Sequence, residues 1–140
     1  MIHYCYLTGL YSRYDVLIFE RQGKSLVKAG YKVTYIVCDD KPNELRDGIE
    51  IISTGFLPRN RFERFFKTYN LLLNLALKVD ADIYQVSDPE LVSIVLPLQR
   101  KNKKVIFNLR EFYPTMLMGK HYIPKYIRSI VASLYTCFLK

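Results

Sequence analysis

Charged side chains follow two of the apolar runs in this sequence, where they could bind or act on a polar ligand. Asp88 and Glu90 flank a proline after one run, and Arg110 precedes Glu111 after another. A carboxylate accepts hydrogen bonds, and a guanidinium presents a planar fork of donors that fits a phosphate or a carboxylate. These residue types therefore suit the recognition of a polar or anionic ligand.

Each pair also has a purely structural interpretation. Asp88-Pro89-Glu90 combines a helix N-cap, a proline at the first helical position and an acid in the first turn. Arg110 and Glu111 could form an exposed ion pair, which contributes little to stability. Because both pairs directly follow expected strands, the binding interpretation stays open for each of them.

The loop after the first apolar run is a third candidate. It begins Thr8-Gly9-Leu10-Tyr11-Ser12 and continues to Arg13, a cation that could contact a phosphate or a carboxylate. Gly9 lacks the Gly-x-Gly-x-x-Gly spacing of dinucleotide-binding loops, so a phosphate-binding turn and a plain turn both stay open. The missing spacing disfavours a dinucleotide-dependent oxidoreductase.

Histidine and cysteine are too scattered to predict a metal site or a disulfide framework. His3 and His121 are isolated, and Cys5, Cys38 and Cys137 lie far apart in the sequence. Zinc sites and disulfide scaffolds need clustered spacing. We expect buried free thiols in a reducing compartment and no bound metal.

Strands and helices are expected to alternate along the chain and to bring these residues together. Apolar runs predict strands, and amphipathic or leucine-rich segments predict helices. The expected strands are 2–8, 31–38, 48–54, 82–87 and 103–109, and the expected helices are 16–29, 61–79, 89–101 and 124–140. No helix is expected before the third strand, which leaves room for a short β–β connection there.

This alternation predicts a Rossmann-like, doubly wound α/β domain with a mainly parallel sheet. In such sheets, ligands bind at the carboxyl ends of the strands, near the point where the strand order reverses. The rule points to four loops, which are 9–15, 39–43, 87–90 and 110–114. Tyr113, in the last of these loops, is the tyrosine that we single out for contact with a ligand.

Length and composition fit one globular domain that attracts anions. The chain has 140 residues, 50% of them apolar and 14% aromatic, which argues against a disordered protein. Twenty-one Lys and Arg against thirteen Asp and Glu give a net charge of +8, which suits nucleic acid, acidic lipid or phosphorylated substrates.

The longest uncharged apolar stretches, 68–77 and 129–139, are too short to cross a bilayer, and no signal peptide is recognised. We therefore expect a soluble or peripheral protein.

Two segments combine cations with aromatic residues. In 59–67, four cations are interleaved with three phenylalanines, and 120–128 has a similar composition. Such segments suit an anionic membrane surface, and they also suit a helix that buries its phenylalanines and solvates its arginines. Nucleic-acid binding is disfavoured because no recognised reader motif accompanies the charge.

Taken in order, several segments resemble one family. They are Arg13-Tyr14-Asp15, the run 24–33, Ala81-Asp82-Ile83-Tyr84 leading into Ser87-Asp88-Pro89-Glu90-Leu91, and 103–107 leading into Arg110-Glu111. Their order and spacing are similar to the N-terminal domain of GT-B fold, family 4-type glycosyltransferases, particularly those that assemble bacterial surface polysaccharides. The similarity spans nearly the whole chain, and the ordered set is more specific than any single segment.

The resemblance implies the retaining transfer of a hexose from a nucleotide sugar to a saccharide or lipid-linked acceptor, with no required metal or other cofactor. It also implies that the acceptor binds mostly to this half, and the nucleotide sugar mostly to a C-terminal domain that residues 1–140 lack. We therefore expect a truncated N-terminal domain over 1–140, inactive by itself. The enzyme is expected to be cytoplasmic and to work as a peripheral protein at the inner face of the cell membrane.

The resemblance also assigns roles to residues. Glu111 is the candidate catalytic residue, and it shares with Asp88 the expected hydrogen bonds to sugar hydroxyls. Arg110 and Arg13 are candidates for contacts with a phosphate or a carboxylate. The expected substrate-binding residues are Gly9, Ser12, Arg13, Asp88, Glu90, Arg110 and Tyr113.

The chain departs from the family at three positions where relatives often carry histidine, which are Gln85, Ser87 and Arg110. The last of these histidines usually lies beside the transferred sugar. A guanidinium stays protonated near neutral pH and cannot serve as a general base, as an imidazole can. A non-catalytic binding or scaffold domain of the same fold is therefore the main alternative, and a nucleotide-binding oxidoreductase is a second one.

Overall fold

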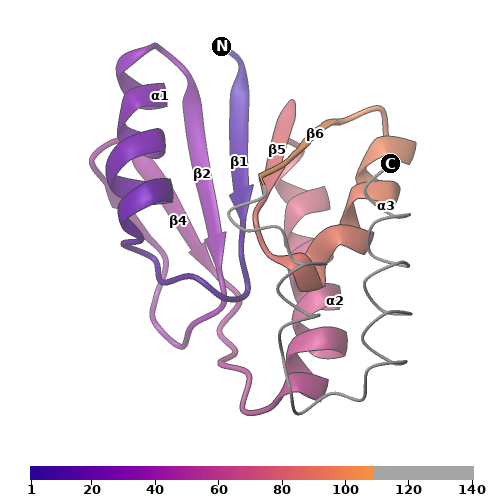
Figure 1. The fold of residues 1–140 in the computed structure, drawn as a ribbon. Helices are drawn as coiled ribbons and strands as arrows, with labels where there is room; N and C mark the ends of the chain where they lie inside the picture. The colour runs from indigo at the N-terminus through magenta and orange to yellow at the C-terminus, as the bar shows by residue number, and fades with distance from the viewer. Residues whose placement is uncertain (109–140) are drawn as a thin grey trace, which may run out of the picture. The chain divides into compact units, whose positions relative to one another are not determined.

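The computed structural model describes residues 1–108, which form a compact unit. The described unit is an α/β fold around a mostly parallel, six-stranded sheet. Figure 1 shows the strands side by side with helices packed against them. The mainly parallel α/β architecture expected from the sequence is confirmed.

The strands are short and are interspersed with helical segments. They are β1 (His3–Leu7), β2 (Lys32–Val37), β3 (Glu44–Arg46), β4 (Ile49–Ser53), β5 (Ile83–Val86) and β6 (Lys104–Phe107). The helical segments are the π-helix η1 (Val16–Gly23), α1 (Lys24–Lys28), α2 (Arg61–Val79), the 3₁₀-helix η2 (Pro89–Ile94) and α3 (Val95–Arg100). The segment 124–140, expected as a helix, lies outside the described residues.

The strand order in the sheet is β3-β4-β2-β1-β5-β6. Every neighbouring pair is parallel except β3 and β4, which form an antiparallel hairpin. β2 and β4 lie on one side of β1, and β5 and β6 lie on the other, so the order reverses at β1. Sheets of this kind bind ligands where the strands beside the reversal reach their carboxyl ends.

The connection from β2 to β4 contains a strand that the sequence did not predict. The short β–β connection for which the sequence left room is present, and β3 follows the expected loop 39–43 within it. Asp47 and Gly48 turn the hairpin with positive φ values of 52° and 79°. Two successive left-handed residues suit a tight hairpin turn, and glycine adopts that conformation without strain.

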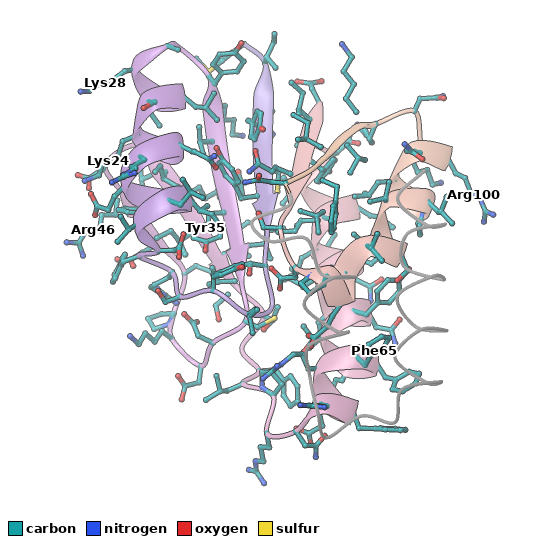
Figure 2. All side chains as sticks on the ribbon, in the orientation of Figure 1. Lys24, Lys28, Tyr35, Arg46, Phe65 and Arg100 are labelled. Atoms are coloured by element: carbon teal, nitrogen blue, oxygen red, sulfur yellow. The ribbon has the colours of Figure 1, made fainter. Side chains whose placement is uncertain are left out.

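Alternate residues of the strands face two separate hydrophobic cores. Tyr6 of β1 and Tyr35 of β2 (Figure 2) pack in one core with Phe19 of η1. Leu7 packs in the other core with Leu72 of α2 and with residues of η2 and α3. Because side chains alternate between the faces of a strand, helical segments can cover both faces of the sheet.

The helix α2 has defined caps at both ends. The Asn60 side chain accepts a hydrogen bond from the Glu63 amide (2.9 Å), and the Glu63 carboxylate accepts one from the Arg59 amide (2.8 Å). Asp80 ends the helix in a left-handed conformation with a φ of 52°. These caps fix the bounds of α2, which are those expected from the sequence. None of the helices described in the structure is long and apolar enough to cross a membrane.

Candidate functional site

The candidate site lies where the adjacent, parallel strands β1 and β5 reach their carboxyl ends. Thr8 and Gly9 follow β1, and Ser87 and Asp88 follow β5. Because the strand order reverses at β1, the two loops belong to the place where ligands bind in sheets of this type. Gly9 and Ser87 lie at one edge, as expected, whereas Arg110, expected with them, lies outside the described residues.

Asp88 joins the two loops. It is 1% exposed and accepts hydrogen bonds from Thr8 Oγ1 (2.8 Å) and from the Gly9 amide (2.6 Å). The Thr8 hydroxyl oxygen in turn accepts hydrogen bonds from the amides of Leu10 (3.2 Å) and Tyr11 (3.0 Å). The loop after β1 is thus built around one buried carboxyl group.

Burial raises the pKa of Asp88 to about 6. The hydrogen bonds from Thr8 and Gly9 favour the ionised form and lower the pKa, and the charge of Glu90 raises it, but burial has the largest effect. A carboxyl group that titrates near neutral pH in this position is typical of a functional site.

Gly9 lies against α2 with no room for a side chain. A Cβ atom at Gly9 would meet Thr68 Cγ2 at 2.8 Å, Asp88 Oδ2 at 3.6 Å and Leu72 Cδ1 at 3.8 Å. The first distance is shorter than two nonbonded carbon atoms tolerate. Glycine is therefore required here because the loop approaches the helix closely.

The helix α2 brings two unsatisfied polar groups to this edge. Thr68 Oγ1 and Arg64 Nε are buried, and neither has a nitrogen or oxygen partner among the described residues. Thr68 lies beside the thiol of Cys38, whose pKa burial raises to about 11. Arg64 Nη1 lies 3.7 Å from Glu90 Oε1, two residues after Asp88. Buried polar atoms without partners are rare, and because both atoms are closed to solvent, a ligand or water reaches them only if neighbouring side chains move.

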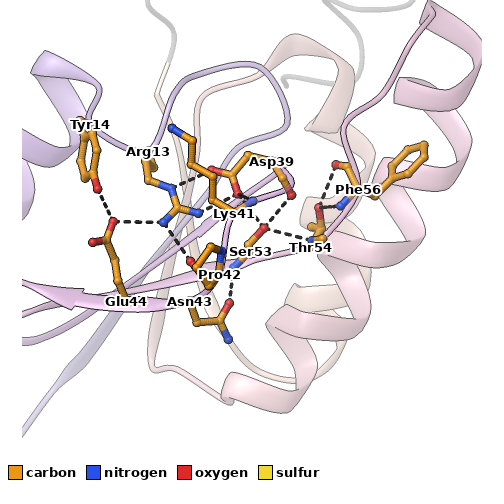
Figure 3. A network of polar contacts seen from close by, with 11 residues as sticks. Arg13, Tyr14, Asp39, Lys41, Pro42, Asn43, Glu44, Ser53, Thr54 and Phe56 are labelled. Carbon is orange, nitrogen blue, oxygen red and sulfur yellow. Dashed lines mark hydrogen bonds and ion pairs between the residues drawn. The ribbon is translucent and has the colours of Figure 1, made fainter.

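Arg13 is the centre of a second polar cluster, between the loops after β1 and β2 (Figure 3). Its Nε and Nη2 atoms donate to the two carboxylate oxygens of Asp39 at 2.7 Å each. Its Nη1 atom donates to the Pro42 carbonyl and to Glu44 Oε1 at 3.0 Å each, and Tyr14 donates a further hydrogen bond to Glu44. Arg13 is 5% exposed, and these hydrogen bonds commit most of its donors to protein groups.

The same contacts set the charges of the Arg13 cluster. The hydrogen bonds to Asp39 raise the pKa of Arg13 above its ordinary value. Burial raises the pKa of Asp39, but hydrogen bonds from Arg13, Ser53 and the Lys41 amide outweigh it and hold that pKa below the ordinary value. Both groups are therefore charged at neutral pH and form a bidentate pair.

The structure places the expected substrate-binding residues in two groups. Gly9, Asp88 and Glu90 lie at the edge where β1 and β5 end. Arg13 lies in the second cluster. The carbonyl of Ser12, the residue before it, accepts a hydrogen bond from the hydroxyl of Tyr35 in β2 (2.9 Å). Contact of these residues with a ligand stays a prediction. The other expected site residues, Arg110, Glu111 and Tyr113, lie outside the described residues.

Gln85 and Ser87, two positions where the family that the sequence resembles often has histidine, are buried. Gln85 Oε1 accepts a hydrogen bond from the Tyr4 hydroxyl (2.6 Å), and Gln85 Nε2 donates one to Gln22 Oε1 (3.1 Å). The side chains of Tyr4, Gln22 and Gln85 line a hollow of about 410 Å³ on the face of the sheet that η1 covers. Tyr6 also lines it, with a buried hydroxyl that has no partner within residues 1–108.

Three residues of the edge between β1 and β5 were not predicted as site residues. Thr8 is the first polar residue after an apolar run, which is a usable signal. Arg64 and Thr68 extend, at four-residue spacing, the line of Leu72 and Ala76 on the buried face of α2. A polar residue that continues a line of buried apolar residues is the signal that could have identified them.

Within residues 1–108, no group of three or more His, Cys, Asp or Glu side chains is placed to hold a metal ion. Cys5 and Cys38 are buried and free, as their spacing predicted. The groups that the edge offers a ligand are therefore hydroxyl, carboxylate and guanidinium groups.

Comparisons with protein-family models, with curated proteins and with solved structures find no match to this chain. The class of protein is therefore defined by what the chain itself shows. It has a mostly parallel α/β unit with a polar site at the edge where its strand order reverses. That arrangement is typical of proteins that bind a small polar ligand at the carboxyl ends of the strands.

Proposed function

We propose that the chain is the N-terminal, acceptor-side domain of a Rossmann-like, GT-B fold glycosyltransferase. In this proposal the enzyme transfers a hexose from a nucleotide sugar to a saccharide or lipid-linked acceptor. The observation that carries the proposal is the buried Asp88, which joins the loops after β1 and β5 where the strand order reverses. The segment around Asp88 is also one of those through which the sequence resembles this family.

The amides of the first loop favour a hydroxyl-bearing ligand over a dinucleotide. A dinucleotide-binding loop presents free backbone amides to the pyrophosphate. In this chain the Gly9 amide donates to Asp88, and the amides of Leu10 and Tyr11 donate to Thr8. An ionised Asp88 would also repel a pyrophosphate. These contacts disfavour the oxidoreductase alternative.

A saccharide acceptor needs both hydrogen-bond donors and acceptors from the protein. Glu90 offers partly exposed carboxylate oxygens as acceptors, and Arg64, whose Nη1 lies 3.7 Å from Glu90 Oε1, offers partly exposed donors. Transfer forms a bond between the acceptor oxygen and the anomeric carbon, while the bond from that carbon to the nucleoside diphosphate breaks and the acceptor proton passes to the departing phosphate oxygen. In the proposal, Glu90 orients a sugar hydroxyl, Asp88 holds the loop after β1 in place beside it, and Glu111 keeps the catalytic role that the resemblance implies.

A non-catalytic binding domain of the same fold is the second candidate. One observation favours it, because Gln85 stands where relatives often have histidine and is engaged with Tyr4 and Gln22 inside the protein. A side-chain amide cannot change its charge near neutral pH as an imidazole can. A domain of this kind would bind a saccharide without transferring a sugar to it.

The test is a transfer assay on the complete open reading frame that contains residues 1–140, expressed to its own stop codon. Hexose nucleotides serve as donors, oligosaccharides and lipid extracts serve as acceptors, and mass spectrometry measures the glycosylated product. We expect transfer by the wild type and a loss of roughly ten- to a hundredfold in kcat/KM for Glu90→Gln, because a charge-assisted hydrogen bond to the acceptor is lost. The matched control is Glu20→Gln, which changes an exposed carboxylate of η1.

The outcomes separate the candidates. Transfer that falls with Glu90→Gln and persists with Glu20→Gln supports the proposal. Saccharide binding without transfer supports the second candidate, and absence of both binding and transfer contradicts the proposal. Residues 1–140 alone are expected to give no turnover, because the proposal assigns the donor site to a second domain.

A further inference from the structure

The first two turns of α2 carry phenylalanines that the fold leaves exposed. Phe62, Phe65 and Phe66 are 73%, 54% and 56% exposed. Their spacing of three and four residues makes them neighbours on the helix surface. The ring centroids of Phe62 and Phe66 are 4.7 Å apart, and those of Phe65 and Phe66 are 6.1 Å apart. The three rings form one apolar surface, the phenylalanine patch.

The phenylalanine patch is not part of the packing between α2 and the sheet. Leu72 and Ala76, further along α2, are fully buried in the core. Figure 1 shows that the later turns of α2 lie against the sheet, whereas its first turns extend beyond the carboxyl ends of the strands. Large apolar side chains gathered on an exposed surface mark an interaction site. The patch is therefore available to a partner.

The phenylalanine patch lies within a basic segment of the sequence. The segment 59–67 contains four cations and a single acid, Glu63, and the whole chain has a net charge of +8. The Glu63 carboxylate already accepts a hydrogen bond from the Arg59 amide at the start of the helix. The cations of the segment are Arg59, Arg61, Arg64 and Lys67. Charge complementarity therefore selects an anionic partner with an apolar component.

We propose that the start of α2 docks on an anionic lipid bilayer. The phenylalanine patch lies in the interface, and Arg59 and Lys67 lie beside the headgroups. A helix with exposed aromatic residues and flanking cations binds at the boundary between headgroups and acyl chains, and anionic lipid strengthens the binding. Nucleic acid fits less well, because Phe62 and Phe66 pack on one another and do not stand apart as platforms for successive bases.

The inference does not depend on the proposed transfer reaction, since it uses only exposed residues at the start of α2. The same helix carries Arg64 and Thr68, which lie at the edge where β1 and β5 end. Docking through the first turns of α2 would therefore hold that edge close to the lipid surface. An acceptor anchored in lipid could then reach the candidate site without leaving the bilayer.

The charge part of the proposal is tested by sedimentation with vesicles of phosphatidylcholine, alone or mixed with phosphatidylglycerol. We expect binding to the mixed vesicles only, weakened as salt rises from about 0.1 M to about 1 M and the screening length falls from about 10 Å to about 3 Å. Arg59→Gln/Lys67→Gln should weaken binding about tenfold or more. The control Lys28→Gln/Arg100→Gln removes the same charge from exposed positions on α1 and α3 (Figure 2) and should change binding less than about twofold.

The apolar part is tested by Phe62→Ser/Phe66→Ser, with Leu45→Ser/Leu96→Ser as the control at exposed leucines of β3 and α3. All four side chains are exposed, so circular dichroism should show an unchanged fold, and only the phenylalanine variant should lose vesicle binding. Phe62→Trp gives the chain its only tryptophan, because the sequence has none. Its fluorescence should shift to the blue with mixed vesicles and stay unchanged with phosphatidylcholine.

Equal sedimentation with both kinds of vesicle, or no sedimentation with either, would overturn the proposal. Equal losses in the α2 variants and in their controls would also overturn it, because they would show an effect of overall charge or apolarity alone. Binding to single-stranded RNA that depends on the same residues, without vesicle binding, would assign the patch to nucleic acid instead. Hexose transfer by a chain that does not bind vesicles would overturn this inference and leave the proposed function standing.

Discussion

At the scale of single residues, the buried carboxyl group of Asp88 shapes the loop after β1. Two donors, the Thr8 hydroxyl and the Gly9 amide, point at it, so the loop depends on an acceptor in that position. Burial disfavours the charge that these donors prefer, and the pKa of about 6 reflects that conflict. Because the charge of Asp88 changes with pH, the residue connects the geometry of the loop after β1 to the pH.

Asp88 should make the free energy of unfolding fall as the pH rises from about 4 to about 7. The folded chain keeps the Asp88 proton up to a pKa of about 6, above the ordinary value of 3.8, so it binds more protons than the unfolded chain between those values. That stabilisation is complete below the lower value and is lost as the pH rises through the upper one. It amounts to about 3 kcal/mol. Urea unfolding of the wild type and of Asp88→Asn across this range measures it.

The comparison with Asp88→Asn isolates this group. Asp39, whose pKa is lowered, contributes in the opposite direction, because its stabilisation is lost as the pH falls, and it is present in both proteins. A stability difference between the wild type and Asp88→Asn that stays constant with pH would contradict the raised pKa of Asp88.

Gly9→Ala should destabilise the chain by about 1–3 kcal/mol. The new Cβ would overlap Thr68 Cγ2, which belongs to a branched, fully buried side chain that has little freedom to move. Thr68→Ser removes that methyl group, so the double variant should recover part of the loss. Thermal unfolding of the two single variants and the double variant measures the coupling, and simple additivity would show that Gly9 and Thr68 do not pack as described.

At the scale of elements, the Arg13 cluster ties the loop after β1 to the loop after β2 and to β3. A lysine cannot reproduce the bidentate contact with Asp39 or the additional donation to Glu44. Arg13→Lys should therefore lower the free energy of unfolding by roughly 1–3 kcal/mol and speed hydrogen exchange in β3. The matched control, Arg21→Lys at an exposed position of η1, should change neither. Unchanged exchange in β3 for Arg13→Lys would count against this role.

Some elements could be predicted from the sequence and others could not. The bounds of α2 were predicted from its leucine-rich face, and the structure supplies the caps that agree with them, an asparagine at the start and a left-handed residue at the end. β3 was missed because its three residues are largely exposed and carry no apolar alternation. The π and 3₁₀ geometry of η1 and η2 was missed because helical periodicity in a sequence does not distinguish these helices from an α-helix.

At the scale of the whole molecule, the candidate site could be predicted only in part. Gly9 and Asp88 were found because polar residues directly after strands gather at one edge of a parallel sheet. Arg64 and Thr68 were missed because they come from α2, and only the packed structure shows that this helix reaches the same edge. Arg13 was expected to face a ligand, and the structure shows its donors engaged with Asp39, a partner 26 residues away that spacing alone does not reveal.

The most direct test of the central claim maps ligand binding onto the backbone of the chain by NMR. The amide signals of ¹⁵N-labelled chain are followed during titration with oligosaccharides and a short-chain, lipid-linked saccharide. We predict shifts concentrated at Gly9, Arg64, Thr68, Asp88 and Glu90, with weaker binding for Glu90→Gln. Shifts centred on the hollow beside Gln85, or the absence of any shift at the edge where β1 and β5 end, would contradict the claim that this edge is the acceptor site.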